Sequence, residues 1–298
     1  MTSSGRSVPL VSVGMPVFNG ERYVAEAIES ILNQTFPDFE LIVSDNASTD
    51  RTAEICQAYA QRDARIRLYR SDKNRGAAWN FNRVFWLARG RYFKWASSDD
   101  LCHPEYLASC LPILEADPGV VLCYGRTQII DEQGRFVQDY SDNLHLDQDS
   151  PAERFSSFLR QVGLCNPVFG VIRAKALAQT RLLGAFPGSD TCLLAHLALL
   201  GKFVQVPKVL FYRRFHSEAS SAKKDLQNQM AFFDPRREVK VAMPALRRWL
   251  EFVRVVGQSG LPAGERLRIY LRLARTFFWW RDVFGQEFRA AVAAAAQA

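Results

Sequence analysis

Residues 8–50 read VPLVSVGMPVFNGERYVAEAIESILNQTFPDFELIVSDNASTD, and this stretch decides the fold. It contains two short apolar runs rich in β-branched residues, Leu10–Met15 and Phe39–Ser44, which have the composition of buried parallel strands. Between them, apolar residues recur at helical spacing, at Val24, Ile28, Ile31 and Leu32. A strand, a helix and a strand in this order predict a β-α-β unit, whose crossover helix ends near Asn33.

The same alternation repeats along the next fifty residues. We predict a helix that carries Ile55 and Tyr59, a strand at Ile66–Tyr69, a helix over Phe81–Ala88 and a strand at Tyr92–Ala96. Strands that alternate with helices favour an α/β fold with a mostly parallel sheet and helices on both faces.

After Asp100 the alternation becomes less regular. The predicted elements are a helix at Glu105–Glu115, a strand at Val120–Gly125, a hairpin at Asp131–Gly134, a mobile loop at Asp139–Ser150, a strand at Val168–Ile172, a buried helix at Thr191–Leu200 and, within Phe203–Phe215, two short strands broken at Pro207. We place the end of the first domain near Ser221, which gives domains of residues 1–221 and 222–298. The second is a helical appendage with basic amphipathic helices at Val239–Val256 and Ala263–Phe284.

Composition limits the class of protein and its location. The chain has 298 residues, of which 48% are hydrophobic and 23% charged, so it can bury a large core. Its net charge of +7 suits a phosphate-bearing ligand or an anionic surface. The first eight residues lack the apolar segment of a signal peptide, and six scattered cysteines without a Cys-x-x-Cys pair suit a reducing compartment. No apolar run reaches membrane-spanning length. We therefore predict a cytoplasmic location, with contact at the inner face of the membrane left open.

Three polar loops follow predicted strands, and we name them here. The first loop is Pro16–Gly20, the second loop is Ser44–Asp50, and the acidic loop is Ser97–Asp100. Because ligands bind at the carboxyl ends of parallel strands, all three are expected at one edge of the sheet. The first loop lacks the Gly-x-Gly-x-x-Gly pattern and no Walker sequence is present, which disfavours a dinucleotide oxidoreductase and a P-loop enzyme.

The carboxylates of these loops, and Asp190 further along the chain, each have a structural interpretation and a binding or catalytic one. Asp45 is placed to accept hydrogen bonds from a base or ribose, but residues of its type also form turns. Asp99 and Asp100 are adjacent, and such a pair suits a hard divalent metal or the first turn of a helix that begins after Pro104. Asp190 precedes an apolar helix, so it can be the N-cap of that helix, a catalytic carboxylate, or both.

Taken in order, these residues resemble the family 2 glycosyltransferases of the Rossmann-like GT-A fold. The resemblance is close from Val8 to Tyr106 and is weaker beyond it. The motifs that carry it are Pro16–Asn19, Ile28–Phe39, the second loop, Asn74–Gly76, the acidic loop, Asn166–Gly170, Gly188–Asp190 and His216.

The resemblance implies an inverting, metal-assisted transfer of a sugar from a nucleotide-diphosphate sugar, most commonly a UDP-sugar, to a hydroxyl of a glycan or lipid-linked acceptor. The residues it implies for donor binding are Pro16, Phe18, Asn19, Asp45, Asn46, Arg75 and Asp99. It also implies a divalent metal, Mn²⁺ or Mg²⁺, at Asp99, Asp100 and His216. Asp190 matches the position of the general base.

One position departs from the family pattern. Family members often carry Asp-x-Asp-Asp where this chain has Ser97-Ser98-Asp99-Asp100, so the first carboxylate is replaced by a serine. A sugar-nucleotide-binding or scaffold protein without turnover therefore remains an alternative. A nucleotidyltransferase is another, because it also uses a nucleotide, a metal and an acidic loop. We do not expect a nucleic-acid partner, because no recognised nucleic-acid-binding module is present.

The second predicted C-terminal helix is basic and amphipathic. Arg268, Arg272 and Arg275 share one face, and an apolar neighbouring face is formed by Leu267, Tyr270, Leu271, Ala274 and Phe278. One interpretation is peripheral contact with an anionic membrane, which suits a lipid-linked acceptor. The other is packing against the catalytic domain or against a second subunit in a homodimer.

Overall fold

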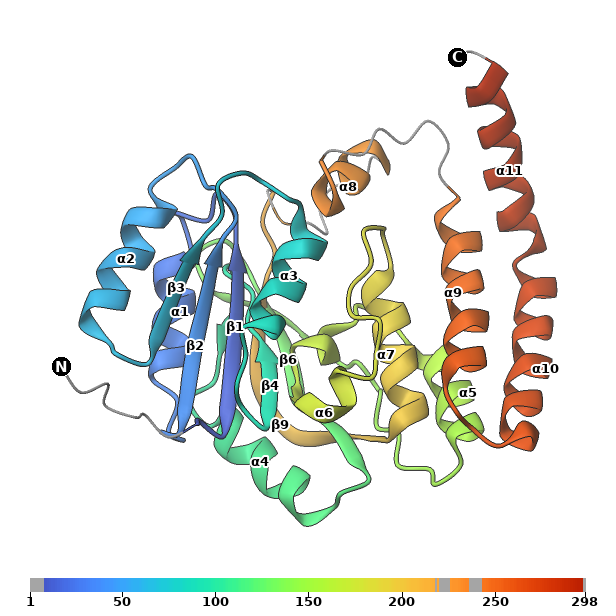
Figure 1. Cartoon of the computed structure of the whole chain (residues 1–298), viewed down its shortest axis with the longest axis horizontal. Coiled ribbons are helices and arrows are strands. Elements are labelled where there is room, and N and C mark those ends of the chain that lie inside the picture. Colours follow the sequence, from blue (N-terminus) through green and yellow to red (C-terminus); the bar gives the residue numbers. More distant parts are fainter. Residues whose placement is uncertain (1–7, 218, 220–225, 236–242, 297–298) are drawn as a thin grey trace.

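The computed structural model describes residues 8–217, 219, 226–235 and 243–296. It has a curved sheet with helices on both faces, and the C-terminal helices stand on the side away from the first strands (Figure 1). The predicted domain boundary near Ser221 lies outside the described residues.

The first half of the sheet is parallel, as predicted. It contains β1 (Val11–Val17), β2 (Phe39–Asp45), β3 (Ile66–Arg70) and β4 (Tyr92–Trp95), in the spatial order β3-β2-β1-β4. The crossover helices are α1 (Val24–Leu32), α2 (Thr52–Arg62) and α3 (Ala77–Trp86). Every residue of β1, β2 and β4 is buried, because helices cover both faces of a parallel sheet.

The second half of the sheet is mixed. The order continues with β8 (Val171–Arg173), β6 (Val120–Ile130), β9 (Lys202–Arg214) and β5 (Leu101–Cys102), while β7 (Phe136–Tyr140) pairs with β6. β8 runs antiparallel to β4 and β6, whereas β6 and β9 are parallel. The remaining helices are α4 (Tyr106–Ala116), α5 (Pro151–Gln161), η1 (Asn166–Phe169), α6 (Ala174–Leu177), α7 (Ser189–Leu200), α8 (Leu226–Phe233), α9 (Pro244–Gln258), α10 (Ala263–Trp279) and α11 (Arg281–Ala296).

Two strand predictions were wrong. The break expected at Pro207 is absent, and β9 continues through it, because the register against β6 skips from Val206 to Val209 and this bulge accommodates the proline. The strand expected at 168–172 begins only at Val171, because the residues before it form the 3₁₀ helix η1.

The prediction of a mobile loop at Asp139–Ser150 was also wrong. Asp142, Leu144 and Leu146 in this segment are buried. Leu146 exchanges two backbone hydrogen bonds of 2.9 Å with Phe203, and Leu144 N donates to the Tyr124 hydroxyl at 3.0 Å. Three buried side chains among many polar ones fix the segment against β6 and β9.

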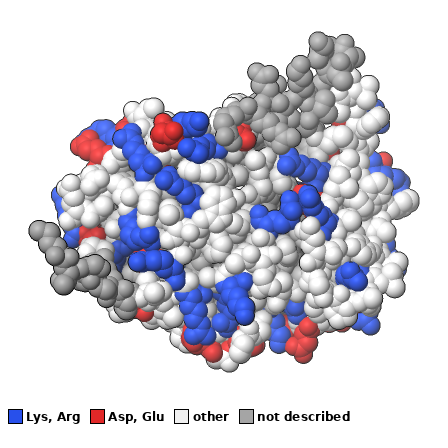
Figure 2. All heavy atoms as spheres, in the orientation of Figure 1, with Lys and Arg blue, Asp and Glu red and all other residues white. Residues whose placement is uncertain are grey.

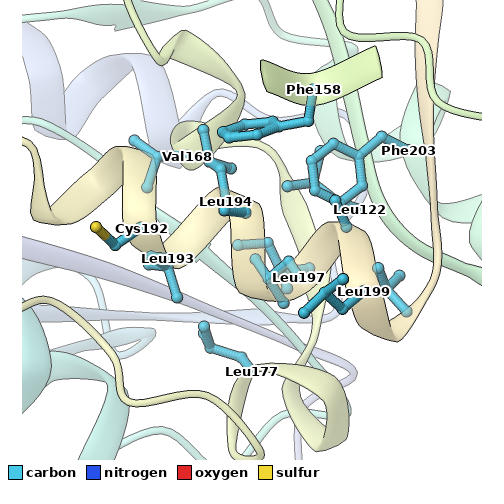
Figure 3. Packing of buried hydrophobic residues seen from close by; sticks show 14 of the residues in the cluster. Leu122, Phe158, Val168, Leu177, Cys192, Leu193, Leu194, Leu197, Leu199 and Phe203 are labelled. Atoms are coloured by element: carbon cyan, nitrogen blue, oxygen red, sulfur yellow. The ribbon is translucent and has the colours of Figure 1, made fainter. Parts of the chain in front are cut away.

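The helix α7 lies at the centre of the larger core. Its apolar side chains contact Phe158 of α5, Leu122 of β6, Phe203 of β9 and Leu177 of α6 (Figure 3). Phe252 of α9 and Leu273 of α10 belong to the same buried cluster. The C-terminal helices are therefore part of the main core, although their helical character matches the prediction. The helix predicted at 263–284 is divided at Trp280 into α10 and α11, and residues 239–242 of the other predicted helix lie outside the described residues.

A buried ionic cluster ties the amino ends of β1 and β2 to the chain between α3 and β4. Glu40 accepts hydrogen bonds from Ser12 Oγ at 2.7 Å, Arg67 Nη1 at 2.9 Å and Arg89 Nη2 at 2.7 Å. Burial alone would raise the pKa of Glu40, but the bonds from Arg89, Ser12 and Arg67 lower it below its ordinary value.

We predict that Glu40→Ala lowers the free energy of unfolding by about 3 kcal/mol, because it leaves two partly buried guanidinium groups without their carboxylate. The pKa of Glu40 is lower in the folded state than in the unfolded state. Its contribution to the free energy of unfolding is therefore fully present above the pKa of the unfolded state and is lost as pH falls through the pKa of the folded state. Urea denaturation at pH 7 and below pH 4 measures both effects. A matched control is Glu54→Ala, which removes the exposed pair with Arg51; equal losses in the two variants would contradict the prediction.

Candidate active site

The first and second loops are joined by hydrogen bonds at the carboxyl ends of β1 and β2. Asn19 N donates to Ser48 Oγ at 2.9 Å, and Thr49 N donates to Asn19 Oδ1 at 2.9 Å. Asn19 has a φ of 50°, a left-handed conformation that asparagine tolerates better than most residues. Gly20 N adds a bond of 2.8 Å to Thr52 Oγ1. The two loops therefore behave as one structural unit.

Asp45 and Asn46 are buried within this unit. Asp45 Oδ1 accepts a hydrogen bond from Ser48 N at 2.9 Å, and its Oδ2 lies 3.1 Å from Arg70 Nε. Asn46 Nδ2 donates to Asn74 Oδ1 at 2.9 Å, and Asn46 Oδ1 accepts from Arg75 N at 3.1 Å. Both side chains thus have internal partners, and Asn46 fixes the loop that carries Arg75.

The other predicted donor-binding residues differ in exposure. Pro16 is buried in β1 opposite Ser44 in β2. Phe18 is 45% exposed, which is unusual for a phenylalanine directly after a buried strand. The Arg75 guanidinium lies 2.9 Å from Asp72 Oδ1 and 4.9 Å from the centre of the Trp79 ring. Phe18 and Arg75 therefore provide an apolar and a cationic surface beside the first two loops.

The acidic loop is held by the end of β9 and the residues after it. Asp99 Oδ2 lies 3.0 Å from His216 Nε2, and Asp99 Oδ1 accepts a hydrogen bond from Ser97 Oγ. Arg214 N donates to Asp100 Oδ1 at 2.8 Å, and Arg214 Nε donates to the Asp99 carbonyl at 2.9 Å. The serine that replaces the family's first carboxylate thus acts as a hydrogen-bond donor to Asp99.

These contacts give the two adjacent carboxyls opposite pKa shifts. Burial would raise the pKa of Asp99, but the bonds from His216 and Ser97 hold it below its ordinary value. Burial and the charge of Asp99 raise the pKa of Asp100 well above its ordinary value. Asp99 is therefore the anionic member of the pair.

The first loop and α1 also contact the residues around the acidic loop. The Tyr23 and His216 rings have centroids 4.9 Å apart, and Glu26 Oε2 lies 2.7 Å from Arg214 Nη2. A Cβ atom placed on Gly20 would lie 3.5 Å from Ser98 Oγ. The three loops that were predicted to meet at one edge of the sheet do so.

Asp190 is the second residue of α7. Gly188, with a φ of 83°, occupies the N-cap position, so the interpretation of Asp190 as the N-cap was wrong. Asp190 Oδ1 accepts a bond from Thr191 N at 2.8 Å. Burial raises the pKa of Asp190, and the Thr191 amide and the charges of Arg213 and Arg248 oppose this effect. The higher pKa makes this carboxylate more basic than an exposed aspartate.

Arg213 of β9 connects these carboxylates, and the sequence analysis missed it. Arg213 directly precedes Arg214, whose amide is bonded to Asp100. Arg213 Nη1 also donates to the Leu164 carbonyl at 3.0 Å, and the next residue, Cys165, lies with its Sγ 3.3 Å from Oγ1 of Thr191, the neighbour of Asp190. Arg213 Nη1 donates to Asn166 Oδ1 at 2.7 Å, and Asn166 Nδ2 donates to Asp142 Oδ2 at 3.2 Å. The position of Arg213, three residues before the predicted metal ligand His216, could have indicated that it belongs to the site. Asp142 lies in a polar run of the sequence, and nothing there indicated a role at the site.

The donor atoms at Asp99 and His216 fit a divalent cation. They offer a carboxylate oxygen and an imidazole nitrogen 3.0 Å apart, and His216 Nδ1 is buried without a hydrogen bond. Within the described residues, no group of three or more His, Cys, Asp or Glu side chains forms a metal site. A cation at this position would take its remaining ligands from substrate phosphates and water, as Mg²⁺ sites commonly do.

A mostly parallel sheet flanked by helices, with these three loops at its carboxyl edge, is an α/β architecture of the GT-A class. The fold is confirmed by similarity to solved structures. The structure of Staphylococcus aureus TarS residues 1–349 in complex with UDP-GlcNAc aligns with a TM-score of 0.65 at 16% identity, covering 95% of this chain and 81% of that one. A mannosyltransferase from Pyrobaculum calidifontis in complex with GDP-Man and Mn²⁺ aligns with a TM-score of 0.53 at 17% identity, covering 98% and 79%.

The sequence comparisons establish the family. Residues 12–181, more than half of the chain, match the profile of Glycosyl transferase family 2, and the chain belongs to that family. It is 29% identical to the chondroitin synthase of Escherichia coli over 231 residues, which are 76% of this chain and 32% of that protein. The chain spans about a third to a half of the length of the curated relatives that it matches. The predicted family is confirmed.

Proposed function

We propose that this protein is an inverting glycosyltransferase that moves a sugar from a nucleotide-diphosphate sugar, with a UDP-sugar as the first choice, to a hydroxyl of a glycan or lipid-linked acceptor. The observation that carries the proposal is the Asp99–His216 pair at the carboxyl edge of the sheet. Arg213 links this edge to the segment 164–166, which contacts the first turn of the helix that carries Asp190. The nucleotide-sugar complexes of two proteins with the same fold support it. In this proposal residues 1–221 form the catalytic domain, residues 222–298 the C-terminal region, and the location is cytoplasmic.

The donor would bind along the first two loops. Phe18 offers its exposed ring to the nucleoside, and Asp45 would offer Oδ2, which is now paired with Arg70 at 3.1 Å. Arg75 supplies positive charge for the base or the diphosphate. Pro16, Asn19 and Asn46 are buried in or bonded within the loops, so their contribution would be to fix the shape of this surface.

The leaving-group side of the reaction would be at the acidic loop. Asp99 and His216 would hold a divalent ion, Mn²⁺ or Mg²⁺, with Asp100 beside them, and when bound this ion neutralises the charge that develops on the diphosphate. Arg214 keeps the acidic loop in place through its bonds to Asp99 and Asp100. Arg213 adds a fixed positive charge between this side and Asp190.

Asp190 would act on the acceptor side. A carboxylate that accepts the proton of the attacking hydroxyl is more effective when its pKa lies nearer the working pH. Burial raises the pKa of Asp190 in this direction. A single displacement with the base and the leaving group on opposite faces of the sugar inverts the anomeric centre.

We predict that a nucleoside diphosphate with Mn²⁺ raises the melting temperature, because a ligand that binds only the native state stabilises it by about 2.7 kcal/mol at 100 times its Kd. A thermal-shift panel of UDP, GDP, dTDP and CMP, each with and without Mn²⁺, measures this effect. The additional shift in melting temperature that depends on Mn²⁺ should vanish in the variants Asp99→Asn and His216→Ala. It should persist in Asp147→Asn, which changes an exposed aspartate outside the site. Failure of every nucleotide to shift the transition would refute a donor site.

We predict that Asp190→Asn lowers turnover by roughly 10²- to 10⁴-fold, the usual contribution of a general base, while the nucleotide-induced thermal shift persists. In the wild type, turnover should fall as pH decreases through a pKa above the ordinary aspartate value, since protonation removes the base. Release of nucleoside diphosphate measures turnover, with Asp147→Asn as control. Release of pyrophosphate would instead identify a nucleotidyltransferase, and donor binding without release would identify a non-catalytic binding protein.

The proposed membrane contact rests on the surface of α10. We call Leu267, Leu271, Ala274 and Phe278 the outer stripe; the three large members are 60%, 59% and 60% exposed. The opposite face, with Ile269, Leu273 and Thr276, is buried, so packing against the protein explains the inner face but not the outer stripe. Tyr270, predicted to share the exposed apolar face, packs instead against the core.

Charge favours an anionic bilayer as the occupant. Residues 263–296 contain six arginines and three acidic residues, a net charge of +3. Two of the acids are bonded to the protein: Glu265 to Ser150 and Ala152, and Glu287 to the first amides of α9. In Figure 2 the edge formed by the C-terminal helices is mostly uncharged (white), with separate patches of Lys and Arg (blue). No helix in the described part of the chain is long and apolar enough to cross a bilayer; the proposed contact is peripheral.

We predict that the full chain floats with vesicles of phosphatidylglycerol and phosphatidylcholine but not with phosphatidylcholine alone. A double variant, Leu271→Ser with Phe278→Ser, should reduce flotation at least tenfold, because it removes exposed apolar area from the outer stripe. Leu250→Ser on α9, which is 52% exposed and outside the stripe, is the matched control. Equal flotation of all three proteins would contradict the prediction, as would a stable homodimer that the double variant dissociates.

A further inference from the structure

Arg248 of the C-terminal region reaches the first turn of α7. Gly188, the N-cap of α7, lies two residues before Asp190. A Cβ atom placed on Gly188 would lie 3.4 Å from both Cδ and Nη1 of Arg248. The absence of a side chain at Gly188 therefore leaves room for this guanidinium beside the proposed base. Arg248 is far from Asp190 in sequence and belongs to α9, whose helical pattern gave no indication of a role at the site.

Arg248 lacks the acidic partner that its neighbours have. On the same helix, Glu251 pairs with Arg181 at 3.4 Å and with Arg254 at 3.7 Å. Among the described residues, no carboxylate lies within ion-pair distance of Arg248, and its Nε is buried without a hydrogen bond. Its contact is with the Trp280 ring, 5.0 Å from the centroid. A half-buried guanidinium that is not directly paired with a carboxylate has unused hydrogen-bond donors, and an anionic ligand can bind to them.

The mechanism decides which substrate faces Arg248. In a single displacement the diphosphate leaves on the face of the sugar opposite to the base. The cationic groups that serve the diphosphate are therefore at the acidic loop, whereas a cation beside Asp190 lies toward the acceptor. Arg213, the other arginine near Asp190, is already bonded to Asn166 and to the Leu164 carbonyl. The guanidinium of Arg248, unlike that of Arg213, has no hydrogen bond to another group in the described part of the chain.

We propose that Arg248 binds an anionic group of the acceptor, a phosphate or a carboxylate, next to the hydroxyl that receives the sugar. This inference rests on the proposed function and narrows its acceptor to an anionic glycan or a phosphate-bearing chain. A guanidinium suits the task because it donates two parallel hydrogen bonds to either anion. Arg248 would act as a specificity residue, and Asp190 would remain the proton acceptor.

Arg248 also couples acceptor binding to the basicity of Asp190. The charge of Arg248 opposes the rise in the pKa of Asp190 that burial causes. An anion on Arg248 would neutralise part of this charge, and the pKa of Asp190 would then rise further. An anionic acceptor bound to Arg248 would therefore make Asp190 a stronger base while the acceptor is in the site, whereas a neutral acceptor would not.

The test uses the full chain saturated with UDP and Mn²⁺, or with whichever nucleotide the thermal-shift panel selects. Isothermal titration with glucose, glucuronate and glucose 6-phosphate gives one neutral, one carboxylate and one phosphate probe on the same sugar. Binding of one or both charged sugars at least tenfold tighter than glucose is expected, and the stronger of the two identifies the anion. Arg248→Gln should weaken that binding about 10- to 100-fold and Arg248→Lys less, as for loss of charge-assisted hydrogen bonds.

Two controls separate this inference from the proposed function. Arg254→Gln, on the exposed side of the same helix, should leave binding of the charged sugar unchanged. The nucleotide-induced thermal shift should be the same in wild type and in all three variants, because Arg248 lies on the acceptor side. If the shift is present but glucose binds as tightly as the charged sugars, or Arg248→Gln binds them normally, the inference is overturned while the donor site stands. If no nucleotide binds, both fail.

Discussion

The in-register parallel pairing of β1 with β2 and β4 is the constraint on which the site depends. Val17 pairs with Asp45, and Gly14 pairs with Trp95, so the first loop, the second loop and the acidic loop leave the sheet at similar heights. Short polar side chains then suffice to join them. A slip of one residue between β1 and β2 would turn every buried side chain of these strands to the opposite face and separate Asn19 from Ser48.

The end of β9 supplies what the parallel strands lack, which is positive charge beside the acidic loop. Arg213 and Arg214 are the last two residues of β9, and His216 lies two residues beyond its end. Arg214 holds Asp100 and the backbone of the loop, while His216 holds Asp99. Two adjacent carboxyls can lie together there because one is bonded to a histidine and keeps its charge, while the other has a raised pKa. The long β9 strand, continuous through its proline, is therefore a requirement of the site.

Local pattern predicted the parts of the fold that local forces determine. The β-α-β units around residues 10–100 were predicted correctly, because strand composition and helical spacing are both visible within a few residues. The errors involve long-range contacts. The bulge at Pro207 depends on the register of β6, the order of residues 141–146 depends on Phe203, and Arg213 gains its role from neighbours distant in sequence. No short window of sequence contains that information.

The groups proposed for the donor side come from both ends of the chain, because the loops after β1, β2 and β4 precede Asp190 whereas Arg214 and His216 follow it. The family match ends at residue 181, after the loops that would hold the nucleotide and before Asp190, Arg213, His216 and Arg248. The matched residues contain the parallel half of the sheet together with β5, β6, β7 and β8, whereas the groups that we propose for the acceptor side come from α7 and α9. The helices α9 and α10 share a buried core with α7, the helix that carries Asp190. Arg248, which we propose to bind the acceptor, therefore belongs to a helix that a boundary near residue 221 would assign to an appendage, although this helix is part of the main core.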